Sequence, residues 1–313
     1  MPNARQLELR LSAPYRNRTL FADHYLAHLL PNDPRWAEAR EEATRVLDRL
    51  RNLYAREADR LDAYNESQLE QHWFRPILRA LGHVFEVQPT VPGLEAHIKR
   101  PDYVLFRDEA ARQRAVTQQQ EEAYAREALA VGEVKAWETP LGKKRRGGGP
   151  RFEDRNPSWQ IDYYLRATGV DWGILTNGRL WRLVHIESSQ RLQVYYEVDL
   201  VQLIEQGDPG AMGYFTLFFR QAAFRPDAQG RVFLEDARAA SHAYAVALEE
   251  DLQANVYRAL EHLIQGFLDL PRNGLGPDDL PAIYDNSLYL LYRLLFILYG
   301  ESRGLLPMRN EAY

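Results

Sequence analysis

Two acidic residues and a lysine are spaced so that they can act together on a phosphodiester bond. Asp102 opens the apolar run YVLF, and Glu133 and Lys135 lie in a second strand-like run, LAVGEVKAWETP. Side chains alternate between the faces of a strand, so Glu133 and Lys135 point the same way. Two carboxylates on adjacent strands suit Mg²⁺, which prefers oxygen ligands and leaves positions open for phosphate oxygens. A lysine on that face can orient or deprotonate the attacking water, or stabilise charge on the phosphate.

Helices on either side of these strands carry further candidates. In SWQIDYYLRATG, Gln160 and Tyr164 are four residues apart and therefore share one helix face, from which both can point at the carboxylates. The upstream helix NESQLEQHWFRPILRALG carries Glu66 and Glu70 as optional acids. Glu66 is equally well explained as a residue near a helix start, where an acid interacts favourably with the helix dipole.

A basic, glycine-rich segment follows the second strand. It contains Lys143, Lys144, Arg145 and Arg146 beside three glycines. Two interpretations stay open: a solvated surface loop, or a loop that closes over the DNA backbone.

The elements that must position these residues alternate between helices and strands. Hydrophobic periodicity and turn residues predict helices over 32–61 and 65–82, strands within 83–91 and 100–108, a helix over 108–128, the strand that holds Glu133, a helix over 158–169, a hairpin hinged on Asn177-Gly178, a strand within 192–200, and helices from about 201 onward. The last helix is apolar on most faces, so we expect it to be buried against a partner or another domain.

Composition excludes several function classes. The chain has 313 residues and a net charge of −5. It contains no cysteine, and this rules out disulfides, thiolate metal sites and a cysteine nucleophile. No apolar stretch is long enough to span a bilayer and no signal peptide is present, so we expect a cytoplasmic protein without a membrane partner. There is no G-x-x-x-x-G-K-[ST] phosphate loop, so an ATP-driven motor is not encoded.

The combination Pro101, Asp102, Glu133 and Lys135 resembles the motif of the PD-(D/E)xK nuclease superfamily. Gln160 and Tyr164 repeat the Q-x(3)-Y spacing that follows this motif in RecB-type nucleases. Over residues 60–313 the texture, including RPDYVLF, GEVKAW and LYLLYRLLFILYGESRGLLP, resembles the amino-terminal nuclease domain and helical connector of type IIG (combined) restriction-modification enzymes. The methyltransferase signatures F-x-G-x-G and N-P-P-Y are absent, so we expect a fragment or a stand-alone nuclease module.

The resemblance implies an α/β (α+β) fold: a restriction-endonuclease-like core with a central mixed β-sheet flanked by helices, and a mainly helical C-terminal region. It divides the chain into an N-terminal helical arm (1–60), a nuclease domain (61–205) and a helical connector (206–313) that leads toward a methyltransferase domain. The implied activity is that of a type II restriction deoxyribonuclease in phage defence, with Mg²⁺ as cofactor and Mn²⁺ as substitute. S-adenosylmethionine would belong only to the downstream part.

The expected roles follow from this resemblance and from the chemistry of the residues. Asp102 and Glu133, with the backbone carbonyl of Val134, would hold the metal, and Lys135 would act on the water or the transition state. The expected catalytic set also contains Gln160 and Glu66, and Tyr164 with Lys143, Lys144, Arg145 and Arg146 would contact double-stranded DNA. One such site cuts one strand, so double-strand cleavage would need a second copy on the DNA.

Simpler explanations compete with this hypothesis. Glu133 and Lys135 can instead form an ion pair on an exposed strand face. The whole domain can be a non-catalytic DNA-binding or scaffold module on a nuclease-like fold. A third alternative keeps the nuclease but makes it a stand-alone defence or repair enzyme without an attached methyltransferase or target-recognition region.

Overall fold

The computed structural model describes residues 13–89, 100–118, 126–143, 156–302 and 305–306. It divides into two compact units, Met1–His242 and Ala243–Tyr313. The first unit holds the sheet and all of the described candidate site residues. The second is helical.

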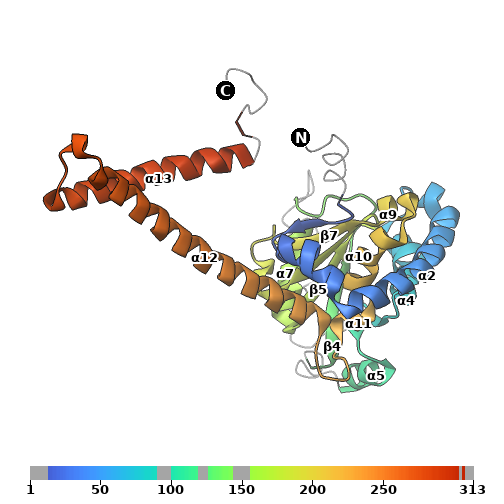
Figure 1. The fold of residues 1–313 in the computed structure, drawn as a ribbon. Helices are drawn as coiled ribbons and strands as arrows, with labels where there is room; N and C mark the ends of the chain where they lie inside the picture. The colour runs from blue at the N-terminus through green and yellow to red at the C-terminus, as the bar shows by residue number, and fades with distance from the viewer. Residues whose placement is uncertain (1–12, 90–99, 119–125, 144–155, 303–304, 307–313) are drawn as a thin grey trace. The chain divides into compact units, whose positions relative to one another are not determined.

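A seven-stranded sheet forms the centre of the first unit, with strand order β1-β7-β6-β5-β4-β3-β2 (Figure 1). The strands β4 and β5 are parallel, and every other neighbouring pair is antiparallel. The predicted mixed sheet flanked by helices is therefore confirmed. The strands are β1 (Arg16–Arg18), β2 (Val84–Val87), β3 (Tyr103–Phe106), β4 (Ala128–Val134), β5 (Trp172–Thr176), β6 (Leu180–His185) and β7 (Tyr195–Asp199).

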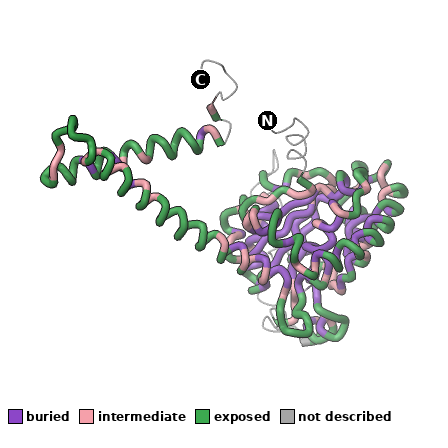
Figure 2. Tube along the Cα trace, viewed as in Figure 1, coloured by how far each residue is buried: buried purple, intermediate pink, exposed green. Residues whose placement is uncertain are grey.

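Both faces of the sheet are covered, and the buried interior is continuous across the strands (Figure 2). Along β4, Ala130 and Val134 belong to one hydrophobic core, whereas Val131 belongs to the other. This alternation follows from the two-residue period of a strand. Helices α2 (Pro34–Glu57), α4 (Arg75–Ala80) and α10 (Pro209–Phe219) contribute to the core of the first face, and α5 (Glu109–Gln118) and α7 (Pro157–Thr168) contribute to the core of the second face.

Two helices of the first face begin where the sequence predicts, and the first of them ends at Glu57, before the predicted end at residue 61. Helix α2 (Pro34–Glu57) starts at an Asp33 cap, and its apolar stripe is buried. The next helix begins at Asn65, which forms a capping box with Gln68, and it stops at Gly82, whose φ is +82°. It is not one regular helix, however. It comprises α3 (Glu66–Leu69), the π-helical turn η4 (Glu70–Phe74) and α4 (Arg75–Ala80).

Helix α7 (Pro157–Thr168) is the crossover between the parallel strands β4 and β5, which a parallel pair requires. Asn156 caps its start by accepting the N–H of Ser158, Pro157 occupies the first turn, and Gly169 ends it in the left-handed region. The sequence NPSW is therefore a helix start. Because α7 packs against β4 and β5, it lies over the second face of the sheet.

The remaining elements of the first unit are mostly short. The strand β1 was not expected from the sequence, because its three polar residues show no apolar alternation. In the predicted 108–128 helix, α5 ends at Gln118, and 119–125 lie outside the described residues. The other elements of this unit are η1 (Tyr25–Leu29), η2 (Leu30–Asn32), η3 (Ala58–Arg60), α5 (Glu109–Gln118), α8 (Ile186–Ser189), α9 (Leu200–Gln206), α10 (Pro209–Phe219), α11 (Gln221–Phe224) and the beginning of α12 (Phe233–Asp269).

The second unit contains the rest of α12, η6 (Pro271–Asn273), η7 (Pro277–Asp279) and α13 (Leu280–Ser302). A helical C-terminal region is thus confirmed. The apolar last helix is largely exposed within this chain: Phe296 is 74% accessible, and a groove of about 690 Å³ on α13 is lined by aromatic and aliphatic side chains. None of the described helices combines the length and the apolar character needed to cross a membrane.

Candidate active site

The two predicted metal-binding carboxylates meet where β3 begins and β4 ends. In the antiparallel register Tyr103 lies opposite Gly132, so Asp102 lies opposite Glu133. The Asp102 carboxylate bridges the two strands directly, because its Oδ2 accepts the backbone N–H of Val134 at 2.8 Å. Strand alternation places Asp102 and Glu133 on the second face, beneath α7.

Glu133 and Lys135 form a buried ion pair. The Lys135 Nζ donates to Glu133 Oε1 at 2.5 Å, and the two residues are 5% and 0% exposed. The interpretation as an ion pair on an exposed strand face is therefore wrong, because the apolar surroundings of β4 exclude solvent from this face. The second oxygen of the carboxylate, Oε2, is buried and has no hydrogen-bond partner in the described part of the chain. An oxygen in that condition is strongly stabilised by any cation that reaches it.

The electrostatics of the site keep Lys135 charged. Burial lowers the pKa of its ammonium, but the charge and hydrogen bond of Glu133, followed by the charges of Asp102 and Glu66, outweigh burial and raise the pKa above its ordinary value. At neutral pH the side chain is therefore a cation. In this state it can neutralise developing negative charge, and it cannot accept a proton from water.

The donor set fits a hard divalent cation. Asp102 and Glu133 supply carboxylate oxygens, of which one is the buried and unpartnered Oε2. Within a strand, the N–H and C=O of one residue point to the same side, so the Val134 carbonyl faces the strand from which Asp102 comes. No group of three or more His, Cys, Asp or Glu side chains suited to a metal occurs among the described residues. A cation here would depend on two carboxylates, a carbonyl and water, a composition that is typical of Mg²⁺ rather than Zn²⁺.

Gln160 and Tyr164 are both fully buried on α7, one helical turn apart. Tyr164 belongs to the hydrophobic core of the second face, together with Val131 of β4. Both residues therefore lie on the helix that packs against the β4 and β5 strands, and their pointing at the carboxylates stays a prediction.

The optional acids behave differently from each other. Glu66 is exposed at the start of α3, and its charge contributes to the raised pKa of Lys135. Glu70 is buried and accepts a hydrogen bond from the Tyr103 hydroxyl at 2.7 Å, while Arg75 donates to the same hydroxyl at 2.9 Å. Burial raises the pKa of Glu70, with a further contribution from the charge of Asp102. Glu70 is therefore fixed by Tyr103, whose side chain packs in the core of the first face, and it interacts with the Asp102 charge without a direct contact to it.

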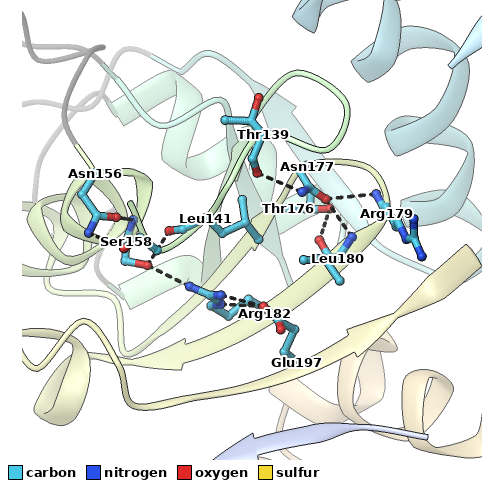
Figure 3. Close-up of polar contacts among 11 residues, drawn as sticks. Thr139, Leu141, Asn156, Ser158, Thr176, Asn177, Arg179, Leu180, Arg182 and Glu197 are labelled. Carbon is cyan, nitrogen blue, oxygen red and sulfur yellow. Dashed lines mark hydrogen bonds and ion pairs between the residues drawn. The ribbon is translucent and has the colours of Figure 1, made fainter. Parts of the chain in front are cut away.

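The segment that leaves the site after Lys135 is held at its far end by a buried network (Figure 3). The Ser158 hydroxyl donates to the Leu141 carbonyl at 2.7 Å and accepts a hydrogen bond from Arg182 at 2.9 Å. Arg182 in turn donates twice to Glu197 Oε2, at 2.9 and 2.6 Å. Through these contacts the strands β6 and β7 fix the position of a backbone carbonyl six residues beyond Lys135.

The near end of the same segment is held by the β5–β6 turn. Asn177 donates from Nδ2 to the Thr139 carbonyl at 2.9 Å, and its Oδ1 accepts the N–H groups of Arg179 and Leu180 (Figure 3). The predicted Asn177-Gly178 hairpin is confirmed, and it does more than reverse the chain. Because Asn177 is buried and bonded on both sides, it couples the hairpin to the exit of the Glu133 strand.

Neither Arg182 nor Glu197 was predicted, although the sequence carries a signal for them. Each is a single charge inside an apolar strand run, LWRLV and VYYEV, and such a charge needs a buried partner. In the sheet Arg182 lies opposite Glu197 on β7 and opposite Leu175 on β5, which itself pairs with Glu133. One transverse row of the sheet therefore links this network to the candidate catalytic strand.

The basic segment lies mostly outside the part of the chain that can be described. Lys143 is exposed, and Lys144, Arg145 and Arg146 fall within 144–155, outside the described residues. The role expected for them stays a prediction.

Comparisons of this chain with protein-family models, with curated proteins and with solved structures found no match. A functional assignment therefore depends on the geometry of the site.

Proposed function

We propose that this protein is a Mg²⁺-dependent endonuclease that hydrolyses DNA phosphodiester bonds. The observation that carries the proposal is the buried cluster of Asp102, Glu133 and Lys135 at the ends of two paired strands. Burying two carboxylates and one ammonium leaves an excess negative charge at the site, which a divalent cation would balance. A fold with no use for that cation gains nothing from the unpartnered Glu133 oxygen.

Each side chain has a role in this proposal. Asp102, Glu133 and the Val134 carbonyl would hold Mg²⁺, which supplies Lewis-acid activation of a phosphate oxygen or of water. Lys135, cationic in its present surroundings, would stabilise the negative charge that develops on the phosphate. Gln160 and Tyr164 would orient the reacting groups from α7, and Glu66 or Glu70 would add a further acid.

The wider assignment belongs to the same proposal. The sheet would be a restriction-endonuclease-like core, in which the β4-α7-β5 crossover carries the catalytic strand and the helix above it. The chain would act as the nuclease part of a type IIG-like restriction-modification enzyme. What supports this is the sequence resemblance described above together with the mixed sheet.

Metal binding and DNA nicking test the proposal separately. We expect wild-type protein to bind Mn²⁺ in calorimetry and to nick supercoiled plasmid with Mg²⁺, and we expect both to be lost in Asp102→Asn and in Glu133→Gln. Lys135→Met should abolish nicking, whereas Lys135→Ala would additionally leave a cavity beside a buried carboxylate. Asp269→Asn, which changes an exposed carboxylate in the second unit, serves as the control.

Three outcomes distinguish the alternatives. A non-catalytic DNA-binding module would retain DNA without Asp102 or Glu133 and would bind neither Mg²⁺ nor Mn²⁺. Nicking that persists in folded Lys135→Met would show that the cluster is not the catalytic site. A stand-alone defence or repair nuclease would instead show full metal-dependent cleavage by this chain alone.

A further inference from the structure

Three arginines line a groove between α2 and α4. Arg49 and Arg56 come from α2 and Arg79 comes from α4, around a volume of about 280 Å³. All three side chains are exposed. This arginine groove lies on the helices of the first face, whereas the candidate catalytic carboxylates point toward the second face.

The arginines of the groove are not engaged in ion pairs within the described residues. None of its three guanidinium groups forms an ion pair with a carboxylate in the described ranges, and no described carboxylate lines the groove. Acids do occur on the first half of α2, but Arg220 engages two of them, at 3.7 Å from Glu38 and 2.9 Å from Glu42. The second half of α2 also carries Asp48 and Glu57, but neither forms an ion pair with a groove arginine in the described ranges, and Glu57 accepts a hydrogen bond from Tyr64 at 2.7 Å.

The positive surface is elongated. Arg45, also exposed, precedes Arg49 by one turn, and Arg56 follows two turns later, so the three lie within about 40° of each other around the helix. From Arg45 to Arg56 the stripe extends roughly 16 Å along α2. A stripe of that length suits a linear polyanion better than a single small anion.

We propose that the arginine groove binds the phosphodiester backbone of DNA at a site separate from the catalytic one. The inference rests on the proposed function only in naming DNA as the polyanion. An arginine guanidinium can donate two parallel hydrogen bonds to two oxygens of one phosphate group. The floor of the groove includes Leu53 and Pro76, which offer no side-chain donors or acceptors to base edges. The contact is therefore independent of base sequence and orients the duplex.

Salt-dependent DNA binding tests the inference. Fluorescence anisotropy with a 24-base-pair duplex in EDTA compares wild-type protein with the Arg49→Gln, Arg56→Gln, Arg79→Gln triple variant. The matched control replaces three other exposed arginines, Arg18, Arg191 and Arg225, by Gln and has the same net charge. If each groove arginine neutralises one phosphate, the slope of log K against log [salt] falls by about 2.7, which is about 500-fold in affinity at 0.1 M salt. The control should keep the wild-type slope.

Every result of this experiment decides the matter. Equal slopes in the groove variant and the control would overturn the inference, as would the absence of any DNA binding by wild-type protein. Displacement of DNA by poly-glutamate at equal charge concentration would show that the groove prefers acidic peptide, and would overturn it too. Plasmid nicking is measured in parallel with Mg²⁺: loss of slope without any nicking supports the groove and contradicts the nuclease, while nicking with unchanged slopes does the reverse.

Discussion

Replacing Arg182 by Met should destabilise the protein far more than replacing an exposed arginine. Arg182 and Glu197 are 5% and 3% exposed, and Met preserves most of the apolar stem of Arg182 but not the guanidinium that lies over the Tyr195 ring. What Met cannot replace is the charge, so Glu197 would be left buried without its two hydrogen bonds. Breaking a buried pair from one side costs about 3–5 kcal/mol in the free energy of unfolding.

That cost is a large share of the stability of a domain, which is about 5–15 kcal/mol in total. For a unit of this size it corresponds to a fall in Tm of roughly 6–20 °C. Removing both charges should be much milder, because the Arg182→Met, Glu197→Leu double variant leaves no buried ion behind. The coupling between the two sites is the difference that a double-mutant cycle reports.

Urea denaturation followed by circular dichroism gives the free energy of unfolding of wild-type protein, the two single variants and the double variant. Equal denaturant slopes would confirm that all four share a common unfolded state. The matched control is Arg179→Met. Arg179 also contacts two carboxylates, Glu138 at 2.7 Å and Asp199 at 2.9 Å, but it is 42% exposed, so its loss should cost no more than about 1 kcal/mol. The reasoning is refuted if Arg182→Met costs no more than Arg179→Met, or if the double variant is as unstable as Arg182→Met.

Three further predictions concern the turn, the pH response and the metal. Gly178 has a φ of +86°, and an added Cβ would lie 2.6 Å from a ring carbon of Trp137. Gly178→Ala should therefore lower the free energy of unfolding by about 1–2 kcal/mol through backbone strain and by a further ~1–3 kcal/mol through overpacking. Gly230→Ala, with a φ of +76° and open space around it, should lose only the backbone part, and equal losses in chemical denaturation would contradict this. Burial lowers the pKa of His83 to about 4. Between roughly pH 6.5 and 4, His83 is therefore protonated in the unfolded chain but stays neutral in the folded protein. The contribution of His83 to the free energy of unfolding is therefore complete above pH 6.5 and falls by up to about 1.4 kcal/mol per pH unit below it. His83→Gln should flatten this dependence of stability on pH. An unchanged dependence would show that His83 is not the group responsible. Mg²⁺ at 100 times its Kd should stabilise wild-type protein by about 2.7 kcal/mol in thermal unfolding, and an equal gain in Glu133→Gln would place the metal elsewhere.

Local signals in the sequence identified most of the framework. Asn65, Asn156 with Pro157, and Gly169 mark helix ends through interactions among neighbouring residues, so a single sequence suffices to find them. The turn at Asn177-Gly178 is equally local.

The sequence was less informative wherever distant segments decide the structure. The π-helical turn η4 precedes Pro76, whose missing N–H disturbs the regular ladder, but the register that buries Glu70 against Tyr103 depends on a strand 33 residues away. Strand β1 exists only because β7 offers it an edge. Within the site, the spacing of Glu133 and Lys135 indicated a shared face, whereas their burial depends on the packing of α7.

The two outer strands of the sheet are short, and both carry charged residues. β1 has three residues, two of them arginines, and β2 has four, among which Glu86 is paired with Arg112. Short, charged strands are poor templates for strand addition by another molecule. Strand β1 pairs with β7, and without it the apolar Tyr195-Tyr196 segment of β7 would form the edge of the sheet. The short strand Arg16–Arg18 therefore covers the edge of β7 and replaces it with a charged edge that disfavours pairing with a strand of another molecule.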